Sequence, residues 1–208
     1  MQSIISICNE ALYHVGITRR IASLDEVSQE GKICKQFYEP SRDELLLEHP
    51  WNFAGMSNKL PELIDRSPFG LHVYGYPENC LHVRRVFCPI RPDLDIWYKV
   101  QRGENGGKVI AVRDFPHDNF RIPVGHVWAE YTAKVSDPLE YPAPFAEALA
   151  LKLSIKITLA LKGDSTGLRD NLMQYYGDAF RRAVELDASE GSHYEHLPQW
   201  SEYIWCRR

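Results

Sequence analysis

The sequence contains no apolar run of about 18 residues, and this absence predicts that the chain does not span a membrane. Its first residues, Met1-Gln2-Ser3-Ile4, lack the basic region and the small-residue cleavage site of a secretory signal peptide. The chain has only five cysteines, an odd number and scattered, which argues against a disulfide framework and favours a reducing compartment. The formal net charge of −4 gives no sign of a strongly basic nucleic-acid-binding domain. Two basic pairs, Arg84-Arg85 and Arg181-Arg182, are of a kind found on any surface.

Paired ligands of the kind that a structural zinc site needs are also missing. The closest group is Cys80, His82 and Cys88, which gives one C-x-H pair and an isolated cysteine instead of two pairs. Ordinary core or surface positions explain these residues better, so we expect no metal and no other cofactor. The glycine-rich residues 103–107 precede Lys108 but lack the order GxxxxGK[ST] and a following helix, which favours a hairpin turn over a phosphate-binding loop.

No catalytic motif stands out. A GxSxG nucleophile elbow is absent, although the members of a catalytic triad need not be neighbours in sequence. A glycoside hydrolase works with two carboxylic acids, and solvated helix faces explain the acids of this chain with fewer assumptions. The pairs that could serve such an enzyme are Glu10 with Asp25, and Glu44 with Glu48. We therefore expect a protein that is not an enzyme, with a glycan hydrolase as the alternative.

What the sequence does contain is a hydrophobic fraction of 44%, ordinary for a packed core, and four segments with apolar residues at helical spacing. Gly16 is placed to supply a left-handed cap after the first helix, Ser28 can cap the second, and Pro40 predicts a kink or brief break. The third helix is apolar on most faces, so it should be the core of the helical half. Helices are predicted over residues 3–15, 29–48, 144–162 and 166–188. One side of the fourth helix carries Leu168, Leu172, Tyr175, Tyr176, Ala179, Ala183 and Leu186.

The segment His49-Pro50-Trp51-Asn52-Phe53-Ala54 stands where helical spacing stops and short β-prone runs begin. Pro50 has no backbone N–H and disfavours a helical conformation at His49, so a helix should end there. Trp51 and Phe53 are large apolar side chains that can pin the departing chain against that helix. The rest of the chain is then organised around this segment, as a helical half that is interrupted by a β-rich insert.

Prolines and glycines recur too often between residues 54 and 140 for long helices, and short β-prone runs replace them. The runs at residues 95–100 and 108–112 flank the turn at 103–107 and predict a hairpin. We expect a small antiparallel sheet of roughly five strands. The clearest strands are predicted over residues 81–87, 95–100, 108–112 and 127–135.

The predicted fold class is therefore α+β. A bundle of about four helices would be formed by residues 1–50 and 142–190, and a β-rich insert by residues 51–141. Residues 191–208 have no helical pattern but are rich in aromatic residues, whereas disordered tails are usually poor in them. This extended tail is predicted to dock on a partner, and its alternative role is a strap over its own helices. The docking residues would be Tyr194, Trp200, Tyr203 and Trp205.

Several segments together resemble the tail tubular protein A family, the head-to-tail adaptors of short-tailed bacteriophages. The resemblance covers roughly residues 3–188, and HPWNFA at residues 49–54 is its most specific part. The local departures are Pro40 and Thr18-Arg19-Arg20. The other segments that carry the resemblance are Ile7-Cys8-Asn9-Glu10-Ala11-Leu12, Val15-Gly16, Ile21-Ala22-Ser23-Leu24-Asp25-Glu26, Cys34, Tyr38, Arg42-Asp43, residues 76–83, Tyr131 through Val135, Ser136-Asp137-Pro138 and residues 145–150.

This resemblance implies a helical bundle with an inserted β domain, and an assembly in which twelve copies form a ring. The ring would lie below the portal protein and receive the tail nozzle or tube on its other face, with double-stranded DNA passing through its lumen. It would be a virion protein that is assembled in the host cytoplasm. A mildly acidic chain fits a channel that passes DNA without sequence-specific binding, because few cations make few phosphate contacts.

Overall fold

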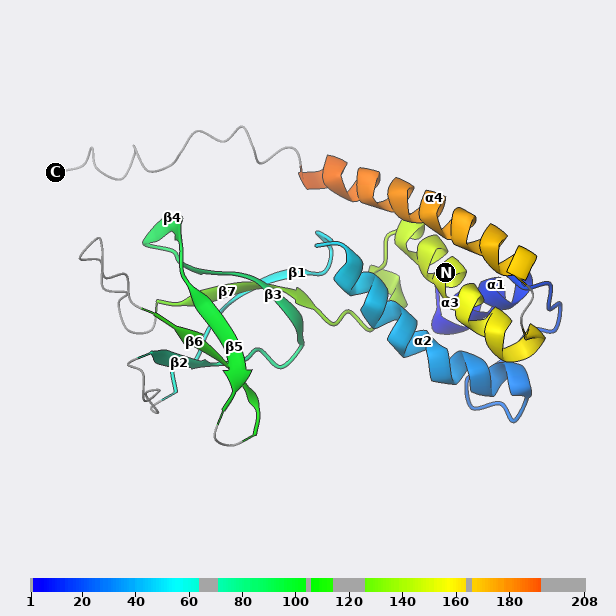
Figure 1. Ribbon diagram of the computed structural model, residues 1–208, viewed down its shortest axis with the longest axis horizontal. Helices are drawn as coiled ribbons and strands as arrows, with labels where there is room; N and C mark the ends of the chain where they lie inside the picture. The colour runs from blue at the N-terminus through cyan, green and yellow to red at the C-terminus, as the bar shows by residue number, and fades with distance from the viewer. Residues whose placement is uncertain (1, 64–70, 104–105, 114–125, 164–165, 192–208) are drawn as a thin grey trace. The chain divides into compact units, whose positions relative to one another are not determined.

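The computed structural model describes residues 2–63, 71–103, 106–113, 126–163 and 166–191, and Figure 1 shows the helices and strands along the chain. These ranges hold four α-helices and two small antiparallel sheets, so the predicted mixed α+β class is confirmed. All four predicted helices are present, each within a few residues of its predicted ends. They are α1 (Ile4–His14), α2 (Gln29–Glu48), α3 (Ala143–Lys162) and α4 (Thr166–Gly191).

The helix ends follow from local chemistry. The Ser6 backbone N–H donates to the Ser3 hydroxyl at 3.0 Å, which caps the start of α1, and Gly16 beyond its end has a φ of +78°. At the start of α2, the Gly31 N–H donates to the Ser28 hydroxyl at 3.1 Å, as predicted. Gly163, with a φ of +66°, ends α3. Short-range capping therefore sets where these helices begin and end.

Helix α2 runs without a break through Pro40, so of the predicted kink or brief break, the break is absent. A proline inside a helix costs one backbone hydrogen bond, and burial of neighbouring side chains offsets that cost. Ser41, Leu45 and Leu46, which follow Pro40, all have no exposed surface. Tertiary packing thus overrides the local signal at this position.

Helix α3 is the most buried of the four described helices, as its apolar sequence predicted. It contacts both α1 and α4. Its two small polar residues, Ser154 and Thr158, donate their hydroxyls to the carbonyls of Leu151 and Ser154, so they are buried without loss of hydrogen bonds. Its buried residues are Phe145, Ala146, Ala148, Leu149, Ala150, Leu151, Leu153, Ser154, Ile157 and Thr158.

Helix α4 buries a narrower stripe than its sequence predicted. Leu172, Ala179 and Ala183 are buried, but Tyr175 and Leu186, which were assigned to the same side, are largely exposed. Helical spacing alone defines a broad apolar arc and does not say how much of it a neighbouring element covers.

The strands form two sheets, with orders β1-β7-β3-β4 and β2-β6-β5. The predicted hairpin around residues 103–107 is formed by β5 and β6, which pair antiparallel. The first sheet contains β1 (Gly55–Lys59), β3 (Cys80–Cys88), β4 (Arg91–Asp95) and β7 (Trp128–Ala133). The second contains β2 (His72–Gly75), β5 (Tyr98–Arg102) and β6 (Lys108–Val112).

The prediction of one sheet with about five strands is wrong, because the described residues form seven strands in two sheets. The predicted strand 95–100 is divided, since Asp95 ends β4 and Tyr98 begins β5. Strands β1, β2 and β4 gave no clear signal. Every side chain of β1 is exposed, β2 has only four residues, and β4 contains Pro92.

A shared apolar core lies between the two sheets. Tyr98 of β5 donates its hydroxyl to the Val83 carbonyl of β3 at 3.0 Å, which links one sheet to the other. The buried core residues are Leu60, Tyr74, Val83, Val86, Cys88, Ile96, Ile110, Val112, Val127, Ala129, Tyr131 and Ala133. Because residues from both sheets contribute, the strands form one packed unit.

Contacts between Cα atoms divide the chain into two compact units. Helix α2 belongs to both, with Asp43 as the first residue in the second unit, where its carboxylate lies 3.4 Å from Lys134 Nζ. The sequence predicted a helical part of residues 1–50 and 142–190 and an insert of residues 51–141. The contacts instead place residues 43–50 with the strands, and residues 51–53 and 137–141 with the helices. The helical unit comprises Met1–Arg42, Trp51–Phe53 and Asp137–Arg208, and the strand unit comprises Asp43–Pro50 and Ala54–Ser136.

Candidate functional site

The residues predicted to dock on a partner, Tyr194, Trp200, Tyr203 and Trp205, lie outside the described residues. The described chain ends at Gly191, the last residue of α4. The end of α4 and the residues that contact it are therefore the described residues nearest in sequence to the predicted docking segment.

Asn52 fixes the end of α4 through two hydrogen bonds to one residue. Its backbone N–H donates to Asp187 Oδ1 at 2.9 Å, and its side-chain Nδ2 donates to the Asp187 carbonyl at 2.6 Å. Asp187 is 7% exposed, so its carboxylate exchanges water for the Asn52 N–H and its carbonyl exchanges water for the Asn52 amide. Residues 135 positions apart in sequence are thereby joined close to the point where the tail begins.

Aromatic rings surround this junction. Trp51 meets Phe145 of α3 edge-on at 5.2 Å between ring centroids, and it meets Phe180 of α4 edge-on at 5.9 Å. Phe53 packs against Phe145 at 4.9 Å and against Tyr141 at 6.2 Å. The sequence had predicted that Trp51 and Phe53 pin the chain against the helix that ends at Pro50. Their aromatic partners come from α3, α4 and Tyr141 instead.

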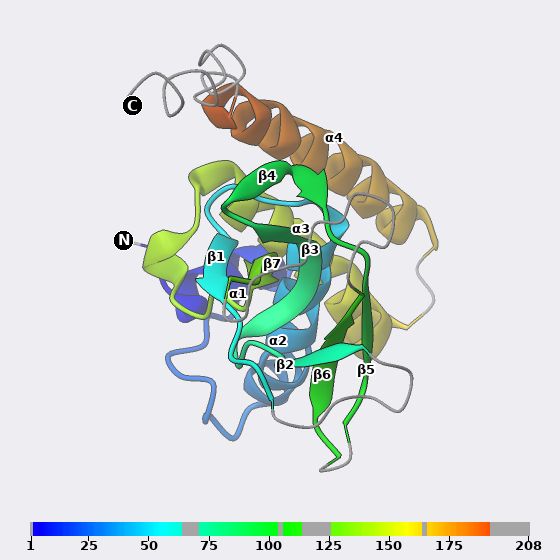
Figure 2. The same cartoon turned by 90° about the vertical axis from the view of Figure 1, so that its left-hand side faces the viewer.

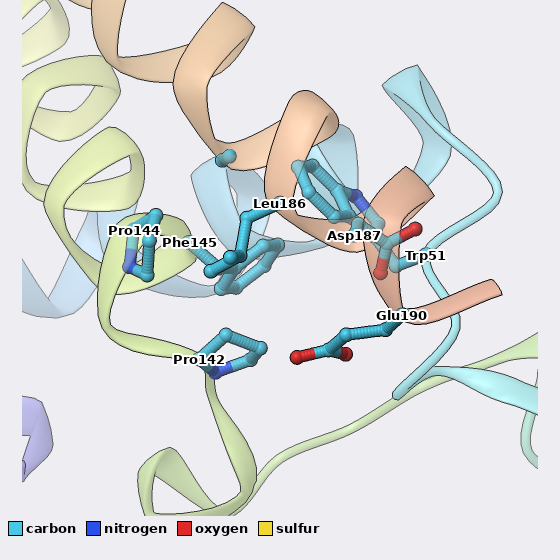
Figure 3. Close-up of a pocket in the computed structure, with 8 residues that line it drawn as sticks. Trp51, Pro142, Pro144, Phe145, Leu186, Asp187 and Glu190 are labelled. Atoms are coloured by element: carbon cyan, nitrogen blue, oxygen red, sulfur yellow. The ribbon is translucent and has the colours of Figure 1, made fainter. Parts of the chain in front are cut away.

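A small hollow lies beside the same junction, and Figure 3 shows the residues that line it. Leu186 of α4 lies next to Pro144 and Phe145 of α3, and the Glu190 side chain extends towards Pro142 (Figure 3). The volume of the hollow is about 10 Å³, which is about the space of one water molecule. It is a gap in packing, and its size excludes an organic ligand.

A larger and more open groove runs along the exposed side of α1, with a volume of about 570 Å³. Tyr13 is the most exposed large hydrophobic residue of its lining, with 73% of its surface accessible. The sequence analysis assigned no role to this face, because its mixture of serine, isoleucine and charge has no pattern. The lining residues are Ser3, Ile5, Ser6, Asn9, Glu10, Tyr13, Ile17, Thr18 and Arg20.

Glu10 is the candidate acid that lines this groove. Burial raises the pKa of its carboxyl above the ordinary value, His14 opposes the rise, and the Glu147 carboxylate adds to it. His14 Nε2 lies 4.0 Å from Glu10 Oε1, and Arg182 donates to Glu147 Oε1 at 2.8 Å. The second acid near Glu10 is thus Glu147, which the sequence analysis did not consider.

The other predicted carboxylates have ordinary surface environments. Asp25 is exposed, and its hydrogen bond with Lys35 at 2.6 Å lowers the pKa of its carboxyl, which is the opposite of the raised pKa that a general acid needs. Glu44 and Glu48 lie one helical turn apart on the exposed side of α2. Of these four predicted acids, only Glu10 lines the groove.

The basic pairs have protein partners. Arg84 Nε donates to Thr132 Oγ1 at 3.0 Å, and Arg85 Nε lies 3.7 Å from Glu130 Oε2. Arg181 lies 3.5 Å from the Asp178 carboxylate, and Arg182 is paired with Glu147 as described above. Three of these four guanidinium groups lie beside carboxylates, which weakens their attraction for phosphate.

Cys80, His82 and Cys88, the closest group of possible metal ligands in the sequence, do not lie together. Cys88 is buried at one end of β3, whereas Cys80 and the exposed His82 lie at the other end. Burial raises the pKa of the Cys80 thiol above its ordinary value, although a hydrogen bond with Tyr76 opposes the rise. Among the residues that the structure describes, no group of three or more His, Cys, Asp or Glu side chains could hold a metal ion.

Comparisons with known proteins do not identify the chain, since no family model matches it and no curated protein matches it. Over the described ranges, each helix is too short or too polar to cross a membrane. Function must therefore be inferred from the geometry above and from the sequence resemblance.

Proposed function

We propose that this chain is a structural virion protein, the head-to-tail adaptor of a tailed bacteriophage. Twelve copies would form a ring between the portal protein and the tail nozzle or tube, and double-stranded DNA would pass through the lumen without sequence-specific binding. The protein would be assembled in the host cytoplasm and reside in the neck of the virion. It would act as a scaffold and not as an enzyme.

The observation that carries this proposal is the segment at residues 49–54, where the sequence resemblance is most specific. Trp51 and Asn52 hold the end of α4 by ring contacts and by two hydrogen bonds to Asp187. A scaffold that joins two partners needs such a fixed junction. This role would explain why the segment combines two large aromatic rings with an asparagine.

In the proposed architecture, residues 1–50 and 142–190 form a helical bundle that packs ring neighbours and meets the portal. The insert of residues 51–141 widens the ring and meets the tail nozzle. The aromatic tail of residues 191–208 docks on the portal, since buried tyrosine and tryptophan residues are preferred interface anchors. The Asn52–Asp187 hydrogen bonds support this, because they hold the helix from which the tail departs.

Charge also supports a channel role. The net charge is −4, and Arg85, Arg181 and Arg182 lie beside Glu130, Asp178 and Glu147. Cations that are paired within the protein release few counterions from DNA, so DNA would slide past them.

The test is to mix the purified protein with portal protein and to follow the mixture by light scattering and negative-stain imaging. We expect a ring with twelve copies on the portal. A chain that stays monomeric and does not bind portal would contradict the adaptor proposal.

A glycan hydrolase is the second candidate, and one observation favours it: Glu10 lines a groove and has a raised pKa. Loss of turbidity of a cell-wall suspension would measure this activity. Glu10→Gln should abolish the activity of a hydrolase, whereas the matched variant Glu44→Gln should not. No clearing by the unmodified chain would eliminate this candidate.

A further inference from the structure

The edges of the two sheets indicate how copies of this chain contact one another. A strand at a sheet edge leaves every second N–H and C=O without a partner, which makes it a template for another strand. The sheets have four edges, formed by β1 and β4 in the first and by β2 and β5 in the second. These four edges are not equally protected.

Two of the edges are closed to a further strand. The outer side of β2 is covered by the segment before it, because Leu63 N–H donates to the Val73 carbonyl and Gly75 N–H donates to the Pro61 carbonyl, both at 2.8 Å. Strand β4 contains Pro92, which has no N–H to donate. The remaining edges are β1 and β5. Over the described residues no backbone hydrogen bond or proline closes the outer side of either strand, and β2 occupies the outer side of the chain after β1 only from Pro61 onward.

The hydrogen bonds of β1 show which of its backbone groups face outward. Ala133 N–H donates to the Ala54 carbonyl, and Leu60 N–H donates to the Val127 carbonyl, so even-numbered residues turn towards β7. Gly55, Ser57 and Lys59 therefore direct their N–H and C=O groups away from the sheet. All five residues of β1 are exposed, and within the described residues nothing bonds to these outer groups.

The same reasoning applies to β5. Gly103 N–H donates to the Gly107 carbonyl and Arg113 N–H donates to the Trp97 carbonyl, so odd-numbered residues turn towards β6. Tyr98, Val100 and Arg102 then direct their backbone groups outward. Each open edge thus has outward backbone N–H and C=O groups at alternate residues of a five-residue strand.

We propose that β1 of one copy pairs antiparallel with β5 of a second copy, and that this joins neighbours in the ring. Figure 2 shows β1 and β5 on opposite sides of the strand unit. A contact between two different surfaces on opposite sides repeats from copy to copy, which is the arrangement that a ring requires. This strand pairing is the contact between neighbours in the ring, and because the ring itself is proposed, the inference rests on the proposed function.

The residues select one register. Placing Gly55 opposite Arg102, Ser57 opposite Val100 and Lys59 opposite Tyr98 aligns all the outward groups of both strands. In this register Lys99 faces Asn58, so no cation lies opposite another cation. A parallel pairing would bring Lys59 and Arg102 to the same end, where like charges repel.

Crosslinking tests this register directly. Met56 and Gln101 would lie opposite each other at a position where side chains come closest, within the range that a disulfide spans. We would prepare Met56→Cys and Gln101→Cys separately, each with Cys80 and Cys206 changed to serine. The two variants are then mixed with oxidised glutathione, alone and with portal protein present.

We expect a crosslinked dimer in the mixture and none with either variant alone. A dimer of Met56→Cys alone would mean that β1 pairs with itself across a two-fold axis, and it would overturn the inference. Absence of crosslinks in every condition would also overturn it. Portal-bound rings without crosslinks would leave the proposed function standing, whereas crosslinked oligomers that ignore the portal would leave the strand pairing standing.

A backbone variant gives a second measurement. Ser57→Pro removes an outward N–H from β1, and it should weaken self-association about tenfold or more, since it removes a hydrogen bond and adds a steric clash. Ser57→Ala keeps the N–H and should associate as the unmodified chain does. Equal association of the two variants, with their strands intact by circular dichroism, would contradict the proposal.

Discussion

Replacing Trp51 with alanine should lower the free energy of unfolding of the helical unit by about 4–5 kcal/mol. The side chain is 1% exposed, and removal of a buried tryptophan costs about 3–5 kcal/mol through lost transfer energy and the cavity left behind. The edge-on contacts with Phe145 and Phe180 add to the loss, since each such pair contributes about 0.5–1.5 kcal/mol. Rigid aromatic neighbours also limit collapse of the cavity, which places the expected value in the upper part of the range.

Urea unfolding followed by circular dichroism at the helical band measures this loss, because tryptophan fluorescence would change with the substitution itself. Trp97→Ala is the matched control. Trp97 belongs to the strand unit, is 51% exposed, and has the Arg113 guanidinium 5.7 Å from its ring centre, so its removal should cost about 1 kcal/mol or less. Similar losses for the two variants would refute the reasoning that Trp51 anchors the helical unit.

Three further results are expected. Gly16→Ala should destabilise the protein by about 1 kcal/mol because its φ is +78°, whereas Gly177→Ala, inside α4 with open space around it, should stabilise by about 0.5–1 kcal/mol; thermal unfolding checks both signs. The raised pKa of Glu10 favours the folded state when the carboxyl is protonated, so this contribution is present below its ordinary value of 4.5 and is lost as pH rises through the raised value. Glu10→Gln should therefore match the unmodified chain in acid and be at least as stable at neutral pH, and a variant less stable only at neutral pH would show the opposite sign. Removal of residues 192–208 should leave the unfolding curve unchanged and weaken portal binding, and equal portal affinity would contradict the docking role of the tail.

The helices could be predicted because their signals are local. Helical spacing and the caps at Ser28 and Gly16 depend on residues within one or two turns, and the structure places these helix ends close to the predicted positions. Pro40 marks where local reasoning fails. Its cost is local, but the burial of Ser41 and Leu45 that offsets it depends on residues distant in sequence.

The strands were harder to predict, because a strand is stabilised by partners that the sequence does not reveal. All five residues of strand β1 are exposed, so it shows no alternation, yet it pairs along its whole length with β7, about 70 residues away. The boundary at Asp95 and Tyr98 was missed for the same reason, since two adjacent segments join different sheets. Pairing, and not intrinsic preference, decides these elements.

The same distinction separates the candidate sites. The segment at residues 49–54 stood out in sequence because it combines a helix stop with two large rings, but Asp187, the partner of Asn52, sits among ordinary exposed residues of α4 and gave no signal. Whether the edges of β1 and β5 are open depends only on which backbone groups remain unpaired, and the residue types give little information about that. Surfaces formed by backbone groups can therefore be found only from a structure, whereas anchors formed by aromatic side chains can be inferred from sequence.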